Sequence, residues 1–302
     1  MEALWKPLAS CHLCPRNCGV NREQGQIGYC RETAEIMAAR AALHMWEEPC
    51  ISGEKGSGAV FFSGCAMQCV FCQNHNIAAA KAGKRISVER LSEIFLELEK
   101  KGAANLNLVT AGHYVPQVVK ALKMAREQGM SIPVVYNSSG YEKVETLRML
   151  EGYVDVYLPD FKYWYEETGR RYSNAPDYRE TAMEALAEMF RQTGEFVFNE
   201  EGYLIRGMVV RHLVLPEHIE EAKQIIHYLY RTYGDRIFIS ILNQYTPLPQ
   251  VKDYPELTRK LTEAEYDEVV EDAISIGVEN GFIQEGGTAE ESFIPEFDCE
   301  GI

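Results

Sequence analysis

Short apolar runs alternate with longer amphipathic segments between residues 59 and 242, as in chains built from repeated strand and helix units. Six runs are predicted to be strands: residues 59–63, 106–110, 133–137, 154–158, 205–215 and 237–242. Apolar residues recur at helical spacing between several of them, as at Leu91, Ile94, Phe95 and Leu98 and again at Ile219, Ala222, Ile226 and Leu229. Because alternating strands and helices form parallel sheets, the pattern predicts an α/β fold around a curled, parallel sheet.

The two ends of the chain break this pattern. Residues 1–50 show little periodicity and end in the run ARAALHMWEEP, which we interpret as an extended arm. A Gly-rich stretch at 51–58 marks a boundary, and a capping box at Thr262 and Glu265 begins a helix that we expect Gly281 to stop. We therefore expect three parts: an N-terminal cysteine-rich arm at 1–50, an α/β domain at 51–250, and a C-terminal helical cap and tail at 251–302.

Composition and charge narrow the class of protein. Of the 302 residues, 46% are hydrophobic and 25% charged, as in an ordinary globular protein. No apolar run is long enough to span a membrane, and the first residues lack the order of a signal peptide, so we expect a cytoplasmic protein without a membrane partner. The formal net charge of −15 repels phosphate backbones and argues against nucleic acid as a partner.

The cysteines change the picture most. The chain has nine, and seven of them fall into two clusters: Cys11, Cys14, Cys18 and Cys30, then Cys65, Cys69 and Cys72. Cys50 and Cys299 stand apart and are expected to be free thiols. Because a cytosolic protein of this size does not need disulfides, clustered cysteines favour metal binding.

The second cluster forms a C-x3-C-x2-C loop directly after the first predicted strand. Three thiolates so close in sequence can hold a 4Fe-4S cluster and leave one iron without a protein ligand. The alternative is structural zinc with His75 as fourth ligand, although such sites usually draw their ligands from two separated loops.

This loop, with Phe71 just before its last cysteine, resembles the signature of the radical S-adenosylmethionine (SAM) enzymes, and among them the relatives of pyruvate formate-lyase activating enzyme. The resemblance covers about residues 51–250. The N-terminal stretches CHLCPRNC and GQIGYC are similar to an uncharacterised subgroup of activating-enzyme-like proteins. The resemblance implies a partial (βα)6 TIM-like barrel that carries the N-terminal arm and the C-terminal helical extension.

The resemblance also implies the cofactors and the reaction. Cys65, Cys69 and Cys72 would hold a 4Fe-4S cluster, and the methionine end of SAM would chelate the iron that lacks a cysteine. An electron from a low-potential donor such as flavodoxin or ferredoxin would cleave SAM, and the resulting 5′-deoxyadenosyl radical would remove a hydrogen atom from the substrate. The protein would supply position and exclude water.

Polar residues at the carboxyl ends of the strands are the expected SAM and substrate site. The SAM site is expected to comprise Phe71, Thr110, Gly112, His113, Asn137, Ser139, Asp160, Lys162, Arg211 and Asn243. The residues expected to act on substrate are Asp160, Lys162, His212 and Gln244. Glu47 and Glu48 of the arm are further candidates for the barrel mouth, and residues 162–176 are expected to form a long active-site loop.

Two of these assignments depend on a match to a family motif, and a third depends on the alternation of side chains along a strand. Residues 110–113 stand where the family carries a Gly-Gly-Glu segment, but they lack its acidic residue. The sequence Asp160-Phe-Lys162 matches the Asp-x-Lys of activating enzymes, and its two charges point to one side of a strand. Arg211 and His212 are adjacent and must face opposite sides; we expect Arg211 to face inward and to neutralise the SAM carboxylate, with His212 as the alternative.

The N-terminal cysteines supply enough thiolates for either of two metal sites. Cys11, Cys14, Cys18 and Cys30 can ligate a whole second 4Fe-4S cluster or close a tetrahedral zinc site. The sequence does not choose between them.

Three functions follow. The first is a radical SAM oxidoreductase that installs a glycyl radical on a partner enzyme. The second is radical SAM modification of a small molecule or peptide. The third, of another class, is an iron-sulfur electron carrier or redox sensor that does not cleave SAM.

Overall fold

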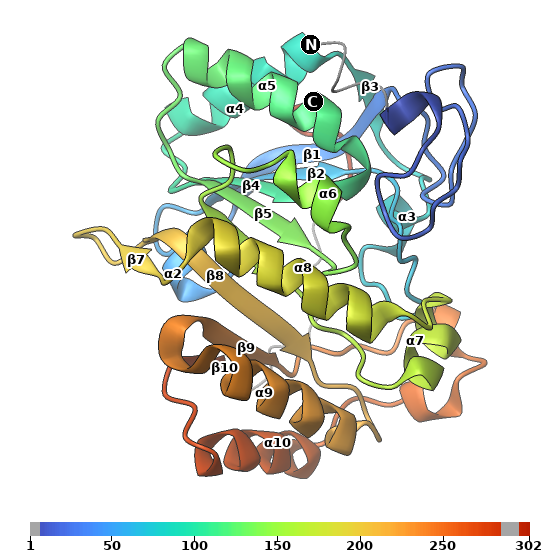
Figure 1. The fold of residues 1–302 in the computed structure, drawn as a ribbon, viewed down its shortest axis with the longest axis vertical. Coiled ribbons are helices and arrows are strands. Elements are labelled where there is room, and N and C mark those ends of the chain that lie inside the picture. Colours follow the sequence, from blue (N-terminus) through green and yellow to red (C-terminus); the bar gives the residue numbers. More distant parts are fainter. Residues whose placement is uncertain (1–6, 285–295) are drawn as a thin grey trace.

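The protein is described here by a computed structural model that covers residues 7–284 and 296–302 (Figure 1). In these residues one sheet runs in the order β10-β9-β8-β6-β5-β4-β2-β1-β3, with β7 paired to β8. The predicted strands are β2 (Ser57–Phe62), β4 (Leu106–Val109), β5 (Val134–Ser138), β6 (Val156–Pro159), β8 (Leu204–Leu213) and β9 (Phe238–Leu242). Each pairs in parallel with its neighbour, as predicted.

The described sheet also contains strands that the sequence did not reveal. β10 (Gly281–Ile283) adds a seventh parallel strand beside β9, so the predicted count of six does not hold. The other additions are antiparallel: β1 (Ile36–His44) on β2, β3 (Lys84–Ile86) on β1, and β7 (Val197–Phe198) on β8. β1 includes residues 39–44 of the run that we interpreted as an extended arm, so this part of the arm belongs to the sheet.

Helices cover the outer face of the sheet. The longer ones are α4 (Val88–Lys100), α5 (Val115–Glu127), α8 (Tyr178–Thr193), α9 (Ile219–Tyr233) and α10 (Glu263–Ser275). The shorter ones are α2 (Pro49–Ser52), α3 (His75–Ala78), α6 (Val144–Arg148) and α7 (Glu166–Ser173). The predicted apolar face of α4 is buried, and Ser87 caps this helix by accepting a hydrogen bond from the Arg90 N–H. Burying such a face is the main source of stability for a helix of this length.

A smaller apolar cluster fills part of the inner side of the sheet. Cys50 and Ile51 of α2 pack there against Val135, Val156 and Val209. Side chains alternate along a strand, so Asn137 and Arg211 point to the same inner side, two residues closer to the carboxyl ends of their strands. The inner side is therefore apolar deep in the sheet and polar near the ends where a ligand would bind.

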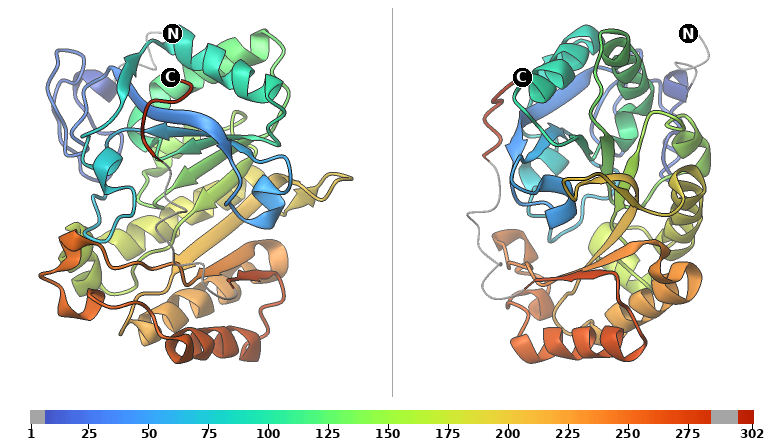
Figure 2. Two further views of the ribbon diagram at one scale, coloured as in Figure 1. Left: turned by 180° about the vertical axis from the view of Figure 1, so that it is seen from behind. Right: turned by 90° about the vertical axis from the view of Figure 1, so that its left-hand side faces the viewer.

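The C-terminal segment returns to the beginning of the sheet, as Figure 2 shows. The Ala41 N–H donates to the Glu300 carbonyl, and the Cys299 N–H donates to the Ala39 carbonyl. Arg40 forms ion pairs with Asp298 and Glu300. The final residues thus lie along β1, while residues 285–295 of the predicted cap and tail are outside the described part of the chain.

Two predictions about local structure were wrong. Residues 162–176 are not one long loop, because α7 occupies residues 166–173. The last predicted helix ends at Ser275, where Gly277 with φ of 97° reverses the chain, and Gly281 begins β10 instead of ending the helix. The division of the chain at residues 50 and 250 stays a prediction. Among the described helices none is long and apolar enough to cross a membrane.

Candidate functional site

The cysteine loop follows β2 at its carboxyl end. Ser63 anchors the start of the loop by donating its hydroxyl to the Ala82 carbonyl at 2.5 Å, and the Cys72 N–H donates to the Cys69 carbonyl at 3.1 Å. All three cysteines of the loop are free thiols with partly exposed side chains. The end of the parallel strand therefore presents three soft metal ligands in one short turn.

Two thiols of the loop are held in their protonated form when no metal is bound. Burial raises the pKa of the Cys65 thiol to about 11 and raises that of Cys72 further; the neighbouring thiols add to both shifts. The Lys162 ammonium works in the opposite direction on both. Thiols in this environment stay protonated at neutral pH until a metal displaces the protons.

Phe71 supports the loop from behind. Its ring is buried and meets the rings of Tyr163, Tyr172 and Tyr245 edge to face, with centroids 6.1–6.3 Å apart. Such contacts between ring edges and faces are favourable, and they fix the position of the two flanking cysteines. The structure thus places Phe71 in an aromatic cluster, where it is mostly covered by protein.

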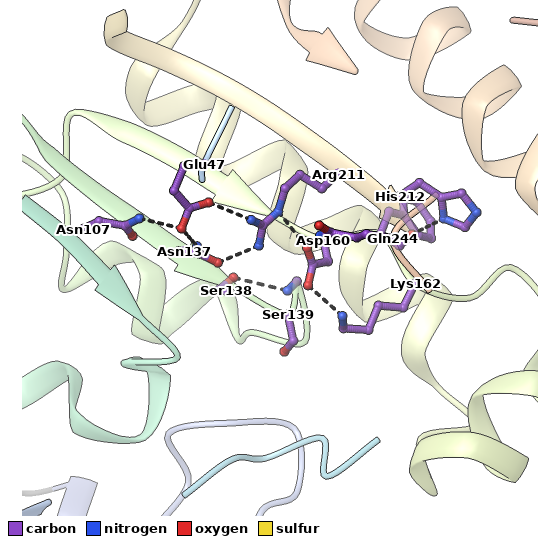
Figure 3. A network of polar contacts seen from close by, with 12 residues as sticks. Glu47, Asn107, Asn137, Ser138, Ser139, Asp160, Lys162, Arg211, His212 and Gln244 are labelled. Atoms are coloured by element: carbon purple, nitrogen blue, oxygen red, sulfur yellow. Dashed lines mark hydrogen bonds and ion pairs between the residues drawn. The ribbon is translucent and has the colours of Figure 1, made fainter. Parts of the chain in front are cut away.

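Polar side chains from several strands join in one network on the inner side of the sheet (Figure 3). Asp160 accepts hydrogen bonds from Lys162 Nζ at 2.6 Å and from Arg211 Nε at 3.0 Å. The Arg211 guanidinium also donates to Asn137 Oδ1 at 2.7 Å and to a Glu47 carboxylate oxygen at 3.1 Å. Glu47 comes from the connection between β1 and α2, so the predicted contact of the arm with this region is present.

Opposite charges balance within this network. Burial disfavours the ionised form of Asp160, but Lys162 and Arg211 outweigh it and hold the pKa of this carboxyl below its usual value. Burial likewise disfavours the Lys162 ammonium, but Asp160, together with Cys69, keeps its pKa above the usual value. Lys162 therefore carries a stable positive charge beside the cysteine loop.

Arg211 is the inward residue of the pair that the sequence left open. His212 lies on the opposite face of β8, where its buried ring donates from Nδ1 to the Phe161 carbonyl at 2.7 Å. Burial lowers the pKa of His212, so the ring stays neutral. The donors of Arg211 bind protein groups, and a ligand carboxylate would have to displace Glu47 or Asp160 to reach them.

The residues after β4 lie under the cysteine loop. His113 is buried, and its Nε2 donates to the Ser63 carbonyl at 2.7 Å. Burial lowers the pKa of His113 to about 3. A Cβ on Gly112 would lie 2.7 Å from the carboxylate of Glu142, so a larger residue at this position would have to push the Glu142 side chain aside. His113 therefore positions the loop, and Thr110, with φ of 61°, makes the turn that leads to it.

Glu142 is a residue that the sequence analysis missed. Burial raises the pKa of its carboxyl to about 8, and the Tyr136 hydroxyl donates to it at 3.4 Å. It is the acidic side chain next to residues 110–113, where the family's own acidic residue is lacking. Its position after the turn that ends β5 gave no signal in the sequence.

The remaining predicted residues are spread along the strand ends. Ser138 and Ser139 lead into Gly140, whose Cβ would lie 2.3 Å from the Asp160 carbonyl oxygen. The Gln244 carbonyl accepts from Gln73 just after the cysteine loop, at 2.8 Å. The Asn243 side chain donates to the Gln284 carbonyl at 3.1 Å, near β10. Gln244 is thus close to the loop, whereas Asn243 contacts the neighbouring strand end.

The structure does not assemble the single-ion zinc site that was the alternative for the cysteine loop. In residues 7–284 and 296–302, no three His, Cys, Asp or Glu side chains are arranged to hold one metal ion. His75 begins α3, and its Nδ1 is buried without a hydrogen-bond partner among the described residues. The donor set that remains, three thiols and no fourth ligand, fits a cluster with one free iron.

Comparison with known proteins gives a family and one similar sequence. The chain matches the sequence model of the radical SAM superfamily over residues 59–229. It is 31% identical over 269 residues to the "Uncharacterized protein MJ0674" of Methanocaldococcus jannaschii, covering 87% of this chain and 73% of that protein.

Solved structures similar to the fold include Streptococcus suis SuiB. SuiB bound to its precursor peptide SuiA is 13% identical with a TM-score of 0.49, covering 74% of this chain and 47% of SuiB. SuiB bound to S-adenosylmethionine is 12% identical with a TM-score of 0.49, covering 74% and 48%. The chain therefore spans about half the length of SuiB.

Proposed function

Because this chain belongs to the radical SAM superfamily, we propose that Cys65, Cys69 and Cys72 hold the 4Fe-4S cluster that the family implies. With SAM, that cluster supplies reductive cleavage to a 5′-deoxyadenosyl radical, which removes a hydrogen atom from a substrate carbon. The observation that carries the proposal is the set of three thiols in one loop at the end of a parallel strand, with the Lys162 ammonium near them.

The network beside the loop suits the methionine end of SAM. That part of SAM carries an ammonium and a carboxylate, and the network offers groups of both signs within hydrogen-bond reach of each other. Lys162 is close enough to Cys69 and Cys72 for their negative charges to raise its pKa, so we propose it as the cation that binds a ligand carboxylate at the cluster. Asp160 fixes Lys162 in place at 2.6 Å. We assign binding to Lys162 and positioning to Asp160 and Arg211.

The aromatic cluster covers the back of the loop and keeps water away from that side. Tyr163, Tyr172 and Tyr245 are each at most 1% exposed and surround Phe71. A reactive carbon radical needs such a dry environment, because exposure to solvent and side reactions would consume it.

The substrate class that we propose first is a glycine of a partner protein. The Asp160-x-Lys162 sequence, which resembles activating enzymes, supports this choice. A small molecule or peptide is the second candidate, favoured by the acidic groups on the inner side of the sheet. Glu48 lies there, and its Oε2 is buried without a hydrogen-bond partner among the described residues. This oxygen could accept a hydrogen bond from an N–H or O–H group of a substrate.

Product analysis tests the proposed reaction. Protein reconstituted with iron and sulfide under anaerobic conditions should release 5′-deoxyadenosine when it is given dithionite and SAM. The Cys69→Ala variant should release none, whereas Cys299→Ala, which removes a cysteine outside both clusters, should behave as the wild type. Complete absence of the product in the wild type would favour the electron carrier or redox sensor.

A second experiment separates the substrate classes. Incubation with a candidate glycyl-radical enzyme should give the doublet of a backbone radical by electron paramagnetic resonance. If candidate partners give no doublet while 5′-deoxyadenosine still forms, the hypothesis of a small-molecule or peptide substrate replaces the hypothesis of glycyl-radical activation.

A further inference from the structure

The N-terminal cysteine segment lies directly against the cysteine loop after β2. The Arg16 Nε, between Cys14 and Cys18 in sequence, donates to the Ala66 carbonyl at 2.8 Å. The Gln68 side chain donates to the Tyr29 carbonyl at 2.5 Å. Two residues of the segment that carries one cysteine set thus bind residues inside the other set.

A third contact joins Gly64, the residue before Cys65, to Cys30 of the N-terminal set. A Cβ on Gly64, which has φ of 84°, would lie 2.6 Å from the Cys30 carbonyl oxygen. Only glycine fits this approach, and Gly64 is bonded to Cys65. Adding standard bond lengths to this contact puts the Cα atoms of Cys30 and Cys65 no more than about 10 Å apart.

The four N-terminal cysteines are gathered in one part of the segment. Cys18 Sγ and Cys30 Sγ each lie 3.6 Å from the position of a Cβ on Gly28. The Gly19 N–H donates to the Cys11 carbonyl at 2.9 Å, and the Asn17 N–H donates to the Cys14 carbonyl at 3.1 Å, so backbone contacts hold Cys11 and Cys14 beside Cys18. The Tyr29 N–H donates to Cys18 Sγ at 3.2 Å.

A buried cation points to a negatively charged occupant. Arg22 is 1% exposed, and its Nη1 lies 3.9 Å from Cys11 Sγ. Its Nε is buried without a hydrogen-bond partner among the described residues. Its Nη1 and Nη2 donate to the His113 and Thr33 carbonyls at 2.6 Å, so Nε is the nitrogen left for a further negative group. Burial raises the pKa of the nearby Glu32 carboxyl, and Arg22 works in the opposite direction. A centre with four thiolate ligands carries negative charge and would offset the cost of burying the guanidinium.

Position favours iron-sulfur over zinc. Zinc has no redox chemistry, whereas a 4Fe-4S cluster held by four cysteine thiolates can accept and pass on one electron. The N-terminal cysteine segment lies against the loop at which the proposed reaction consumes an electron.

We propose that Cys11, Cys14, Cys18 and Cys30 bind a second 4Fe-4S cluster, which is the entry point for the electron that the radical reaction consumes. The role rests on the proposed function. One electron from a low-potential one-electron donor reduces the N-terminal centre and passes to the centre at Cys65, Cys69 and Cys72. There it enters the SAM sulfonium, and the bond from sulfur to C5′ breaks to give methionine and the 5′-deoxyadenosyl radical.

Metal analysis of the wild-type full chain tests the site itself. Protein purified anaerobically should contain about eight irons and eight sulfides per chain, with no stoichiometric zinc. The Cys30→Ala variant should lose about half of the iron, and Cys299→Ala should lose none. About four irons with one zinc, or about four irons alone, would overturn the proposal.

Magnetic spectra test the proximity of the two centres. The Cys30→Ala and Cys69→Ala variants should each give the spectrum of one reduced cluster. Because the two centres are close, the spectrum of the fully reduced wild type should be broadened and should differ from the sum of the two. A wild-type spectrum equal to that sum overturns the proposed proximity. If a variant folds poorly, the wild type alone still tests it, because fully reduced protein without the broadening and splitting of two coupled spins overturns the proximity as well.

The dependence of the rate on the electron donor tests whether electrons enter at the N-terminal centre. With reduced flavodoxin as the probe, Cys30→Ala should lower the rate of 5′-deoxyadenosine release at least tenfold more than it does with dithionite, which is small enough to reach either centre. An equal loss with both donors overturns electron entry at this site. If no 5′-deoxyadenosine forms while eight irons are present, the proposed function fails and the second cluster remains.

Discussion

Replacing Asp160 by Asn removes the negative charge that Lys162 and Arg211 share, with little change in size. Asp160 accepts hydrogen bonds from Lys162 Nζ at 2.6 Å and Arg211 Nε at 3.0 Å. A hydrogen bond to a charged group contributes about 1.5–3 kcal/mol, and an amide keeps one acceptor oxygen. In the variant Arg211 keeps its ion pair with Glu47, whereas Lys162 loses its ion pair with the Asp160 carboxylate. The expected loss in free energy of unfolding is therefore about 2 kcal/mol at pH 7.

Urea unfolding of metal-free, reduced protein, followed by circular dichroism, measures this loss. The matched control is Glu166→Gln, which removes the same charge from an exposed pair with Arg170, where the expected loss is at most about 0.5 kcal/mol. A loss in Asp160→Asn no larger than in this control would refute the reasoning.

The pH dependence of the same difference has a definite sign. The pKa of Asp160 in the folded protein lies below its usual value of 3.8. The stabilisation is therefore present above this usual pKa and is lost as the pH falls through the lower, folded value. The difference between the wild type and Asp160→Asn should stay constant from pH 5 to 7 and shrink below about pH 4. A difference that grows on acidification would contradict the assignment.

Two further predictions concern Gly140 and Glu142, which lie beside the candidate site. Gly140→Ala should lower the urea midpoint much more than Gly102→Ala. Both glycines have positive φ, but a Cβ at position 140 would lie 2.3 Å from the Asp160 carbonyl oxygen, whereas position 102 has open space around it. Equal effects of the two substitutions would show that backbone conformation alone determines the loss. Burial raises the pKa of Glu142 to about 8, so the wild type should lose stability relative to Glu142→Gln as the pH rises from 5 to 8. A constant difference between the urea midpoints of the two proteins across this range would contradict the raised pKa of Glu142.

The six parallel strands that were predicted each contain a run rich in apolar residues, as at Val156–Pro159, which is buried throughout. β1 was missed because its sequence IMAARAALH is rich in Ala, which has low strand propensity, and β10 is only three residues long. α7 was missed because its sequence EETGRRYS shows no apolar stripe. Such elements form because tertiary contacts supply what the local sequence lacks.

The candidate site was predictable where a motif or an alternation rule applied. The cysteine loop and the Asp160–Lys162 pair followed from spacing, and the inward position of Arg211 depended on strand register, which the sequence leaves open by one residue. Glu142 could not be predicted, because its contact with Gly112 joins two loops that are far apart in the chain. Long-range packing of this kind leaves no local pattern.

The central claim is that SAM binds the iron left free by Cys65, Cys69 and Cys72. The most direct measurement is the electron paramagnetic resonance spectrum of the reduced full-length protein with SAM labelled with 15N at its amino group or 17O at its carboxylate. We expect a shifted spectrum with hyperfine coupling to the labelled nuclei, lost in Cys69→Ala and retained in Cys299→Ala. A spectrum that SAM leaves unchanged would contradict it.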